Sequence, residues 1–395
     1  MNNKRWPLMG ETITFSDRLK MAYFCLTANR FTYGEKVKEF ETKWNDWLTE
    51  EKYGKHNSLY VSSGSTANFL LVAAVIEKYG LKPGDKVLLP ACTWMTNVSP
   101  IIQLGLTPIF CDVNMQNYSF DLDEAKLIAR KHKDIKLIFV THLLGFPAEN
   151  SKLKEIFPKA LIIDDVCESH GCKDETGNRV GNLSLGATFS FYFGHHMSTI
   201  EGGMVTTDNI DLYDLMRMKR SHGLARESLV FKMYQDLSPE IDPQFIFQTD
   251  GYNFRNHEIC AVLGISQLDR LSSMVDKRRS NYTKYVEIIN NFPDLFHPHE
   301  YIEGNSSFCF PFICKSKELN LKMKDKFNEH GIEYRPVVAG NLLSQPFLKN
   351  YKMETKRKIP NAQIIHTQGV YIGNNHFVTH YDMEFLSEII GEINV

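Results

Sequence analysis

The sequence predicts an α/β protein with a mostly parallel central sheet and a smaller C-terminal α+β unit. From about residue 58 to 163, short apolar strands alternate with helical segments, and this alternation favours βαβ units. From about residue 276 the pattern changes to a mixture of helices and strands. A chain of 395 residues is also long enough for two domains. We therefore expect a large domain over residues 1–275 and a small domain over residues 276–395.

Each expected element of the large domain has a local pattern. Val37, Phe40, Trp44, Trp47 and Leu48 recur at helical spacing and predict an amphipathic helix. Expected strands cover 58–61, 86–90, 107–111, 135–140, 161–163 and 204–207. Expected helices cover 65–79, 94–104, 121–131, 151–157, 212–220 and 260–274.

The C-terminal unit shows shorter, mixed patterns. Helices are expected at 280–291, 317–329 and 382–392, with strands near 308–313 and 333–338. No long Pro/Gly/Ser linker separates this unit from the first part. We therefore expect the boundary near residue 275 to be a packed joint.

Composition excludes several classes of protein. Lys and Arg number 45 against 47 Asp and Glu, and this near-neutral charge gives no general attraction to nucleic acid or membrane. The longest apolar run, residues 69–76, is too short to span a bilayer. The eight cysteines form no C-x-x-C pair, which indicates reduced thiols and a cytoplasmic location.

Two motifs at strand–helix junctions carry residues suited to ligand binding. The segment 62–66, SSGST, precedes a helix, where small residues expose backbone N–H groups that suit a phosphate. The alternative is an ordinary serine N-cap. Trp94 follows the strand at 86–90 and could lie flat on a planar ligand, although a core tryptophan is an equal alternative.

Two further motifs carry ionisable groups. A strand ends in Asp164-Asp165, with Glu168 close behind, and a buried Asp needs a cationic partner such as a protonated ring nitrogen. One of the two aspartates could instead be a helix cap. The segment 190–203 contains Ser190, His195 and an acidic-Gly-Gly turn. Cys167 to Cys172 lacks a second ligand pair at zinc-finger spacing, so no metal is expected.

Together these motifs carry a resemblance that covers essentially the whole chain. The order SSGSTA, TW, DD-x-x-E-S-x-G and SFY-x-x-H-x-M-S-x-x-EGG resembles the sugar aminotransferase family of DegT/DnrJ/EryC1 type. Residues 251–255, GYNFR, and 31–35, FTYGE, match two more family motifs. The resemblance implies pyridoxal-phosphate (PLP) enzymes of the aspartate aminotransferase fold (fold type I). It also implies a homodimer whose active sites are shared between subunits.

The resemblance implies a role for each matched residue. The phosphate would be held by the backbone of Gly64 and Ser65 together with Ser190, and Asn253 would reach the phosphate in the neighbouring subunit. Trp94 would stack on the cofactor ring and Asp165 would pair with its protonated nitrogen. Glu168, where many members have Gln, would face the ring hydroxyl.

One departure from the family pattern concerns the chemistry. The position of the lysine that binds PLP covalently holds His195, which cannot form that bond but is a good base near neutral pH. Within the family this change is typical of 3-dehydratases of nucleotide 4-keto-6-deoxy sugars. The implied reaction uses PLP and pyridoxamine phosphate with L-glutamate as amino donor, and it gives a 4-keto-3,6-dideoxy sugar nucleotide for O-antigen or capsular polysaccharide.

The cysteines separate two branches of these dehydratases. The branch with a [2Fe–2S] cluster carries a Cys well upstream of a C-x-C pair, whereas here no Cys lies between 173 and 259 and Cys260 has no C-x-C neighbour. We therefore expect no iron–sulfur cluster. The resemblance to the other branch implies a GDP-linked substrate of mannose or heptose type.

The substrate is expected to meet a few basic residues near matched motifs: His222, Arg226, Arg255 and Arg335. Two alternatives remain open at this stage. One is a nucleotide-sugar aminotransferase in which another lysine, such as Lys219, replaces the missing one. The other is a non-catalytic homologue that binds PLP or a sugar.

Overall fold

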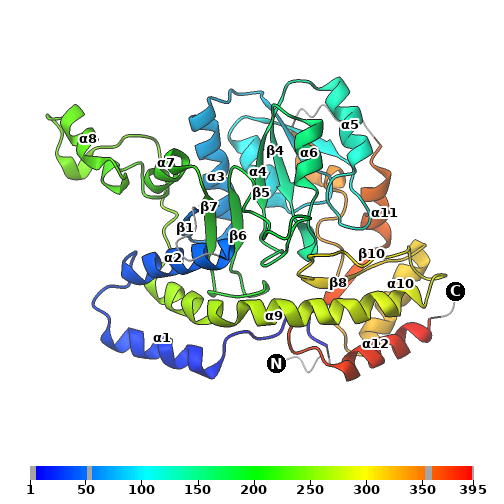
Figure 1. Cartoon of the computed structure of the whole chain (residues 1–395). Coiled ribbons are helices and arrows are strands. Elements are labelled where there is room, and N and C mark those ends of the chain that lie inside the picture. Colours follow the sequence, from blue (N-terminus) through cyan, green and yellow to red (C-terminus); the bar gives the residue numbers. More distant parts are fainter. Residues whose placement is uncertain (1–5, 51–55, 352–357, 394–395) are drawn as a thin grey trace.

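A seven-stranded sheet forms the centre of the molecule (Figure 1). The computed structural model describes residues 6–50, 56–351 and 358–393. Among the described strands of this seven-stranded sheet, only β7 runs antiparallel to its neighbours. The expected mostly parallel sheet is therefore confirmed. In spatial order the strands are β1 (Asn57–Val61), β7 (Gly203–Thr207), β6 (Ala187–Ser190), β5 (Leu161–Asp165), β4 (Ile135–Thr141), β2 (Lys86–Pro90) and β3 (Thr107–Cys111).

Helices cover both faces of this sheet because its strands carry apolar residues on both sides. In β2, for example, Val87 and Leu89 join one core and Leu88 joins the opposite core. One face is covered by α3 (Gly64–Tyr79), α4 (Met95–Gln103) and α7 (Ile210–Arg220). The other is covered by α2 (Glu35–Thr49), α5 (Leu122–Lys131), α6 (Asn150–Ile156) and α9 (Glu258–Asn290).

The helix α9 corrects one expectation. The two helices expected at 260–274 and 280–291 form a single helix of 33 residues. The residues between them, Val275 to Arg279, contain neither Gly nor Pro, so no local signal ends the helix there. The expected domain boundary between residues 275 and 276 falls inside α9. We keep the division into two domains as a proposal, in which this helix belongs to both.

A second, antiparallel sheet lies in the C-terminal part. It has the order β8 (Cys309–Ile313), β10 (Gly369–Gly373) and β9 (Tyr334–Arg335). The strand expected at 333–338 is shorter because Pro336, which has no N–H to donate, follows Arg335. The helices of this part are α10 (Lys317–Glu329), α11 (Pro360–Gln368) and α12 (His380–Gly391).

Two helices lie at the periphery of the large part (Figure 1). The sequence analysis did not identify α1 (Phe15–Thr27), which packs along α9. It also did not identify α8 (Phe231–Leu237), which stands out from the body of the molecule in Figure 1. Across the described residues, no helix combines the length and the apolar character needed to cross a membrane.

Candidate active site

A cavity of about 330 Å³ lies at the carboxyl ends of β4, β5 and β6, next to the first turns of α3 and α4. This edge of an open, mostly parallel sheet is where ligands bind. Many of the site residues expected from the sequence line the cavity: Gly64, Ser65, Trp94, Asp165, Glu168, Ser190 and His195.

The first turn of α3 forms one wall. Ser63 caps this helix, since its hydroxyl accepts the Thr66 N–H at 3.1 Å and Thr66 Oγ1 accepts the Ser63 N–H at 3.0 Å. The serine-cap alternative is therefore correct for Ser63, and it leaves the first N–H groups of the helix without helical acceptors. A Cβ on Gly64 would lie only 2.6 Å from Cβ of Ser190. The glycine thus allows the helix end and the Ser190 hydroxyl to converge, as an anion site requires.

Asp165 ends β5 as a buried carboxylate with fixed orientation. Its Oδ2 accepts amide N–H groups from Asn68 and Asn97, both at 2.8 Å, and its Oδ1 accepts the Cys167 N–H at 2.9 Å. These donors are neutral, so the described side chains that bind Asp165 leave its negative charge uncompensated. Such a carboxylate attracts a cationic group of a ligand.

Glu168 follows on the loop after β5, and its Oε2 accepts the Leu144 N–H at 3.1 Å. Burial raises the pKa of Glu168 to about 7, and the negative charge of Asp165 adds to this effect. The glutamate therefore exchanges a proton near neutral pH, which a glutamine at this position could not do.

His195 lies on the loop between β6 and β7. Its ring packs against Phe308, with 5.7 Å between the ring centroids, and lies 6.1 Å from the ring of His170. Burial, and then the positive charge of Arg278, lower the pKa of His195 to about 4. The imidazole is therefore neutral at neutral pH and able to accept a proton.

Trp94 stands at the mouth of the cavity as the N-cap residue of α4. Its side chain is 55% exposed, so the alternative of a core tryptophan is wrong. An exposed indole at the rim offers a flat face to a planar ligand.

The sequence analysis missed several residues of the site. Asn68 and Asn97 lie on α3 and α4 and orient Asp165, and no pattern in the sequence separates them from amides that face solvent. Met9, Phe308 and Tyr371 complete the cavity wall from segments far away in the chain. No local pattern identifies these three residues, because only the tertiary fold brings them to the site.

Lys219, the lysine of the aminotransferase alternative, does not line the cavity. Its Nζ forms ion pairs with Glu77 at 2.6 Å and with Asp250, and it donates to Thr249 Oγ1 at 3.1 Å. Despite burial, hydrogen bonds to the two carboxylates raise the pKa of Lys219, which keeps it charged and poorly nucleophilic. Among the described residues that line the cavity, none is a lysine.

Five expected site residues lie outside the cavity wall. His222, Asn253 and Arg255 form one cluster, in which Arg255 contacts Nε2 of His222 at 3.3 Å and donates to Asn253 Oδ1 at 3.1 Å. Arg226 is exposed and donates to Gln244 O, near α8. Arg335 is exposed on β9, where it pairs in register with Tyr371 of the cavity wall.

These features fit pyridoxal phosphate on observations of this structure alone. The crowded turn at Gly64 with Ser190 suits the phosphate, and Asp165, buried without a cationic side chain, suits a protonated ring nitrogen. Trp94 offers a face for the ring. The fold and the cavity are those of the PLP-dependent enzymes of aspartate aminotransferase type.

The chain belongs to the DegT/DnrJ/EryC1/StrS aminotransferase family, which it matches over residues 14–390. The family expected from the motifs is therefore confirmed.

Named relatives lie within this family. The chain is 35% identical over 366 residues to a GDP-4-keto-6-deoxy-D-mannose 3-dehydratase of Yersinia pseudotuberculosis, covering 89% of each protein. It is 32% identical over 384 residues to the enzyme of that name from Escherichia coli O55:H7, covering 92% of this chain and 94% of the relative. The solved structure of a GDP-4-keto-6-deoxymannose-3-dehydratase with a trapped PLP-glutamate geminal diamine superposes with a TM-score of 0.89 at 28% identity, covering 98% and 100%.

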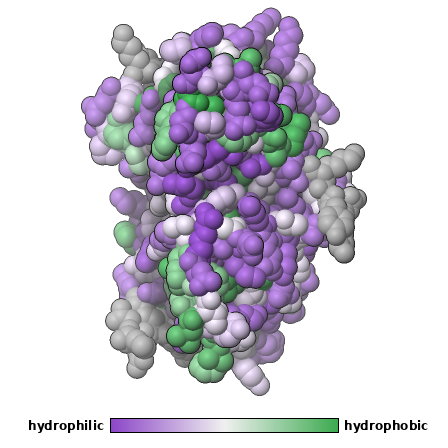
Figure 2. All heavy atoms as spheres, turned by 90° about the vertical axis from the view of Figure 1, so that its left-hand side faces the viewer, coloured by the Kyte–Doolittle hydropathy of each residue, from purple (hydrophilic) through white to green (hydrophobic). Residues whose placement is uncertain are grey.

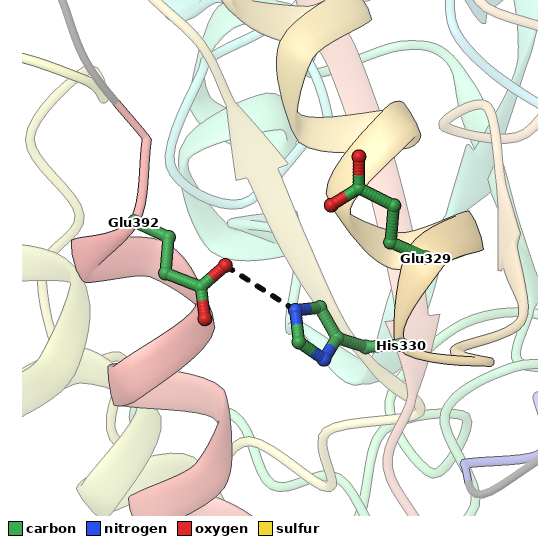
Figure 3. A group of neighbouring side chains, drawn as sticks. All are labelled: Glu329, His330 and Glu392. Atoms are coloured by element: carbon green, nitrogen blue, oxygen red, sulfur yellow. Dashed lines mark hydrogen bonds and ion pairs between the residues drawn. The ribbon is translucent and has the colours of Figure 1, made fainter.

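A group of potential metal ligands lies away from the cavity. Glu329, His330 and Glu392 approach one another between α10 and the end of α12 (Figure 3). The ammonium of Lys326 pairs with Glu329 at 2.9 Å and with Glu392 at 3.0 Å, so both carboxylates already have a cation. We interpret the group as an ion-pair network that joins the two helices, and the expectation of no metal stays a prediction.

Proposed function

We propose that the protein is a PLP-dependent 3-dehydratase of a GDP-linked 4-keto-6-deoxy sugar, with L-glutamate as amino donor. The observation that carries this proposal is His195: a neutral imidazole lies in a cavity whose described lining contains no lysine. An aminotransferase of this family needs the lysine, whereas a dehydratase needs a base that does not bond to the cofactor. Relatives at 35% and 32% identity carry the dehydratase name.

Three groups of the chain would bind and orient the cofactor. The N–H groups of Gly64 and Ser65, with the Ser190 hydroxyl, would hold its phosphate. Asp165 would keep the ring nitrogen protonated, and its two asparagine donors fix the direction of the carboxylate. When bound, the cofactor supplies a conjugated electron sink between the amino group and the sugar.

His195 would move one proton during dehydration. The neutral imidazole would take a proton from the cofactor's C4′ carbon and become an imidazolium, and the electron pair of that C–H bond would pass into the conjugated system that the cofactor supplies. The imidazolium would then give the proton to the C3 hydroxyl, which would leave as water when its C–O bond breaks with the electron pair going to oxygen. A base of low proton affinity is a strong acid once protonated, which suits the second half of this exchange.

Glu168 would bind the cofactor's ring hydroxyl. With a pKa of about 7, its carboxyl exists in both protonation states near neutral pH. It can therefore donate to or accept from the hydroxyl, according to the charge that the ring carries.

The diphosphate of the substrate would be bound by arginines, and Arg226, Arg255 and Arg335 are exposed or half-exposed. His222 would join them as a substrate contact. The expected sugar is of mannose or heptose type. The test is an assay with GDP-4-keto-6-deoxymannose, glutamate and PLP, in which 2-oxoglutarate and ammonia are both measured. Both products support the proposal, and 2-oxoglutarate with an aminosugar but no ammonia would contradict it.

Two alternatives give different results. An aminotransferase with a replacement lysine predicts that borohydride links PLP covalently to the chain, but Lys219 is held by two carboxylates outside the cavity. A non-catalytic homologue predicts PLP binding with no release of 2-oxoglutarate from glutamate. We expect neither result.

We also propose that the active form is a homodimer with shared sites. Two kinds of observation support it. The cluster of His222, Asn253 and Arg255 lies outside the cavity wall of its own chain. In Figure 2, hydrophobic side chains gather in the upper and lower parts of the face that carries α8 and α1. Exposed apolar residues of these segments include Leu19, Tyr23 and Leu26 on α1, and Leu237, Ile241 and Phe245 on and beyond α8.

The mass of the protein in solution tests this part of the proposal. Sedimentation equilibrium is expected to give twice the chain mass of 45.6 kDa, and a monomer at all concentrations would contradict it. The cytoplasmic location stays a proposal based on the spacing of the cysteines, which form no C-x-x-C pair, and fractionation of native cells would test it.

A further inference from the structure

Arg278 is a buried cation for which the described residues provide no carboxylate partner. Its side chain, on α9, is 4% exposed, and it donates hydrogen bonds to the backbone carbonyls of Phe308, at 3.0 Å, and of Asn374. Burial lowers the pKa of Arg278 to about 10, so the guanidinium remains charged at neutral pH. Because an unpaired buried charge is costly, its presence beside the site calls for a functional reason.

A small void connects this arginine to His195. The void measures about 10 Å³, and its wall includes Gly194, His195, Arg278 and Tyr371. A space of this size holds about one water molecule when polar atoms surround it. Two such atoms, Nδ1 of His195 and Nε of Arg278, are buried without any hydrogen-bond partner among the described residues. One water molecule would satisfy both.

We propose that Arg278 is a positioning residue for His195, acting through its charge and through one bound water that accepts hydrogen bonds from both side chains. The water accepts Nδ1–H of His195 and Nε–H of Arg278, so the unprotonated Nε2 is the atom offered to the main cavity. The inference rests on the proposed function only in that His195 is the base.

The other titratable groups around His195 do not place a positive charge beside its ring. His170 and His196 are kept neutral by burial, which lowers the pKa of each well below its ordinary value. The Cys309 thiol, on β8, has its pKa raised by burial and stays neutral too. The other ionisable residues that line the main cavity or the small void together with His195 include His142, Asp165, Cys167, Glu168, Tyr192, Glu201 and Tyr371. The carboxylates among them would favour a charged imidazole, and the guanidinium of Arg278 opposes it.

The experiment is an NMR titration of the apoenzyme labelled at histidine, with His195 identified from the spectrum of His195→Gln. In the wild-type protein the His195 signal is expected to titrate near pH 4. In Arg278→Met the midpoint should move upward, but it should stay below the ordinary value of about 6.5, because burial, the larger cause, remains. Arg278→Lys keeps the charge and should titrate like the wild type.

Lys277→Met is the matched control, because it removes one charge from an exposed position next to Arg278 on the same helix. It should leave the His195 midpoint unchanged. A wild-type midpoint near 6.5, or equal midpoints in wild type and Arg278→Met, would overturn the proposal. If Arg278→Met does not fold, a crystal structure of the wild-type protein decides, through the presence of the bridging water. A crystal structure without a solvent molecule between the two side chains would overturn the bridging water.

The pH profile of ammonia release gives a second readout. The acid limb of this profile should move upward in Arg278→Met by the same amount as the His195 midpoint. His195 could titrate as expected in an enzyme that releases no ammonia. This result would contradict the proposed dehydratase activity, but it would leave this role of Arg278 intact.

Discussion

At the scale of single residues, the site depends on side chains whose neighbours decide their charge. Asp165 receives three hydrogen bonds from neutral donors, and this arrangement orients the carboxylate without neutralising it. The preceding residue, Asp164, is equally buried but does not line the main cavity. It accepts a hydrogen bond from the Asn150 amide at 2.8 Å and lies 3.5 Å from Nε2 of His142. Adjacent residues of one strand therefore serve opposite sides of the sheet.

This difference gives a first prediction. Asp165→Asn should weaken PLP binding at least about tenfold, because one charge-assisted hydrogen bond is worth roughly 1.5–3 kcal/mol. Asp164→Asn is the control and should leave PLP affinity within about twofold of the wild type. Fluorescence titration of the apoenzymes with PLP measures both. Equal losses in the two variants would contradict the role of Asp165.

Glu168 gives a second prediction, on stability. Its pKa is about 7 in the folded apoprotein, whereas an unperturbed glutamate has a pKa near 4.5, so the folded state binds the proton more tightly. The wild-type protein therefore loses stability relative to Glu168→Gln as the pH rises from 4.5 through 7. Thermal melts at pH 5 and pH 8 should show that the melting temperature of the variant rises relative to that of the wild type at pH 8. A pH-independent difference between the two proteins would contradict this assignment.

The site could be predicted from the sequence where it consists of strand ends and helix starts. Gly64, Asp165, Ser190 and His195 follow apolar strands directly, so their motifs are visible in the chain. Asn68 and Asn97 were missed because a polar residue inside a helix looks the same whether it faces solvent or a buried carboxylate. Arg278 was missed for the same reason.

At the scale of elements, α1 depends on one buried ionic contact with α9. Asp17 is fully buried, pairs with Arg270 and accepts a hydrogen bond from Ser266 at 2.7 Å, and its carboxylate also bonds to the Thr14 N–H. Burial alone would raise the pKa of Asp17, but the hydrogen bonds from Arg270 and its neighbours lower it to about 2. The charged carboxylate is therefore favoured by the folded state.

The third prediction concerns this contact. Asp17→Asn should lower the free energy of unfolding by about 1–2 kcal/mol at pH 7, and the difference should shrink as the pH falls from 3.8 through 2. Denaturant unfolding at pH 7 and at pH 3 measures it. Asp269→Asn, at an exposed position of α9, is the control and should change stability by less than about 0.5 kcal/mol. A loss that stays constant down to pH 2 would contradict the ionic explanation.

Helices and strands could be predicted from the sequence where one of their faces is buried. The strands β1 to β5 and the helices α2 to α6 agree with the sequence patterns because each buries a continuous apolar face. The helix α1 was missed because Phe15, Leu19, Tyr23 and Leu26 remain exposed, while its buried residue is a charged Asp17. Binary patterning cannot identify a helix that is held by an ion pair.

At the scale of the whole molecule, the shared site gives a fourth prediction. In the proposed dimer, the cavity of one chain is completed by Asn253 of the other. His195→Asn and Asn253→Ala should each be inactive as pure proteins. Dimers reassembled from an equal mixture should recover about a quarter of wild-type activity, since half of them are mixed and each mixed dimer has one intact site. A mixture without activity would place Asn253 in its own chain's site, and an active Asn253→Ala protein would place it outside catalysis.

The sequence motifs could predict this architecture only through the family resemblance. Alternation of strands and helices indicates a parallel sheet, but it does not indicate that β7 enters between β1 and β6 in the opposite direction. The order of strands depends on long-range pairings, which have no local signature.

The continuous helix α9 also has a practical meaning for dissecting the protein. At 33 residues it is about 50 Å long, and it contacts α1 and α2 near one end and α12 toward the other. A protease cut or a stop codon near residue 275 would divide the helix in the middle and expose apolar surface on both pieces, so neither half is expected to fold separately. A chimera that borrows its C-terminal part from a relative should therefore take α9 whole, with its junction before Glu258 or after Asn290.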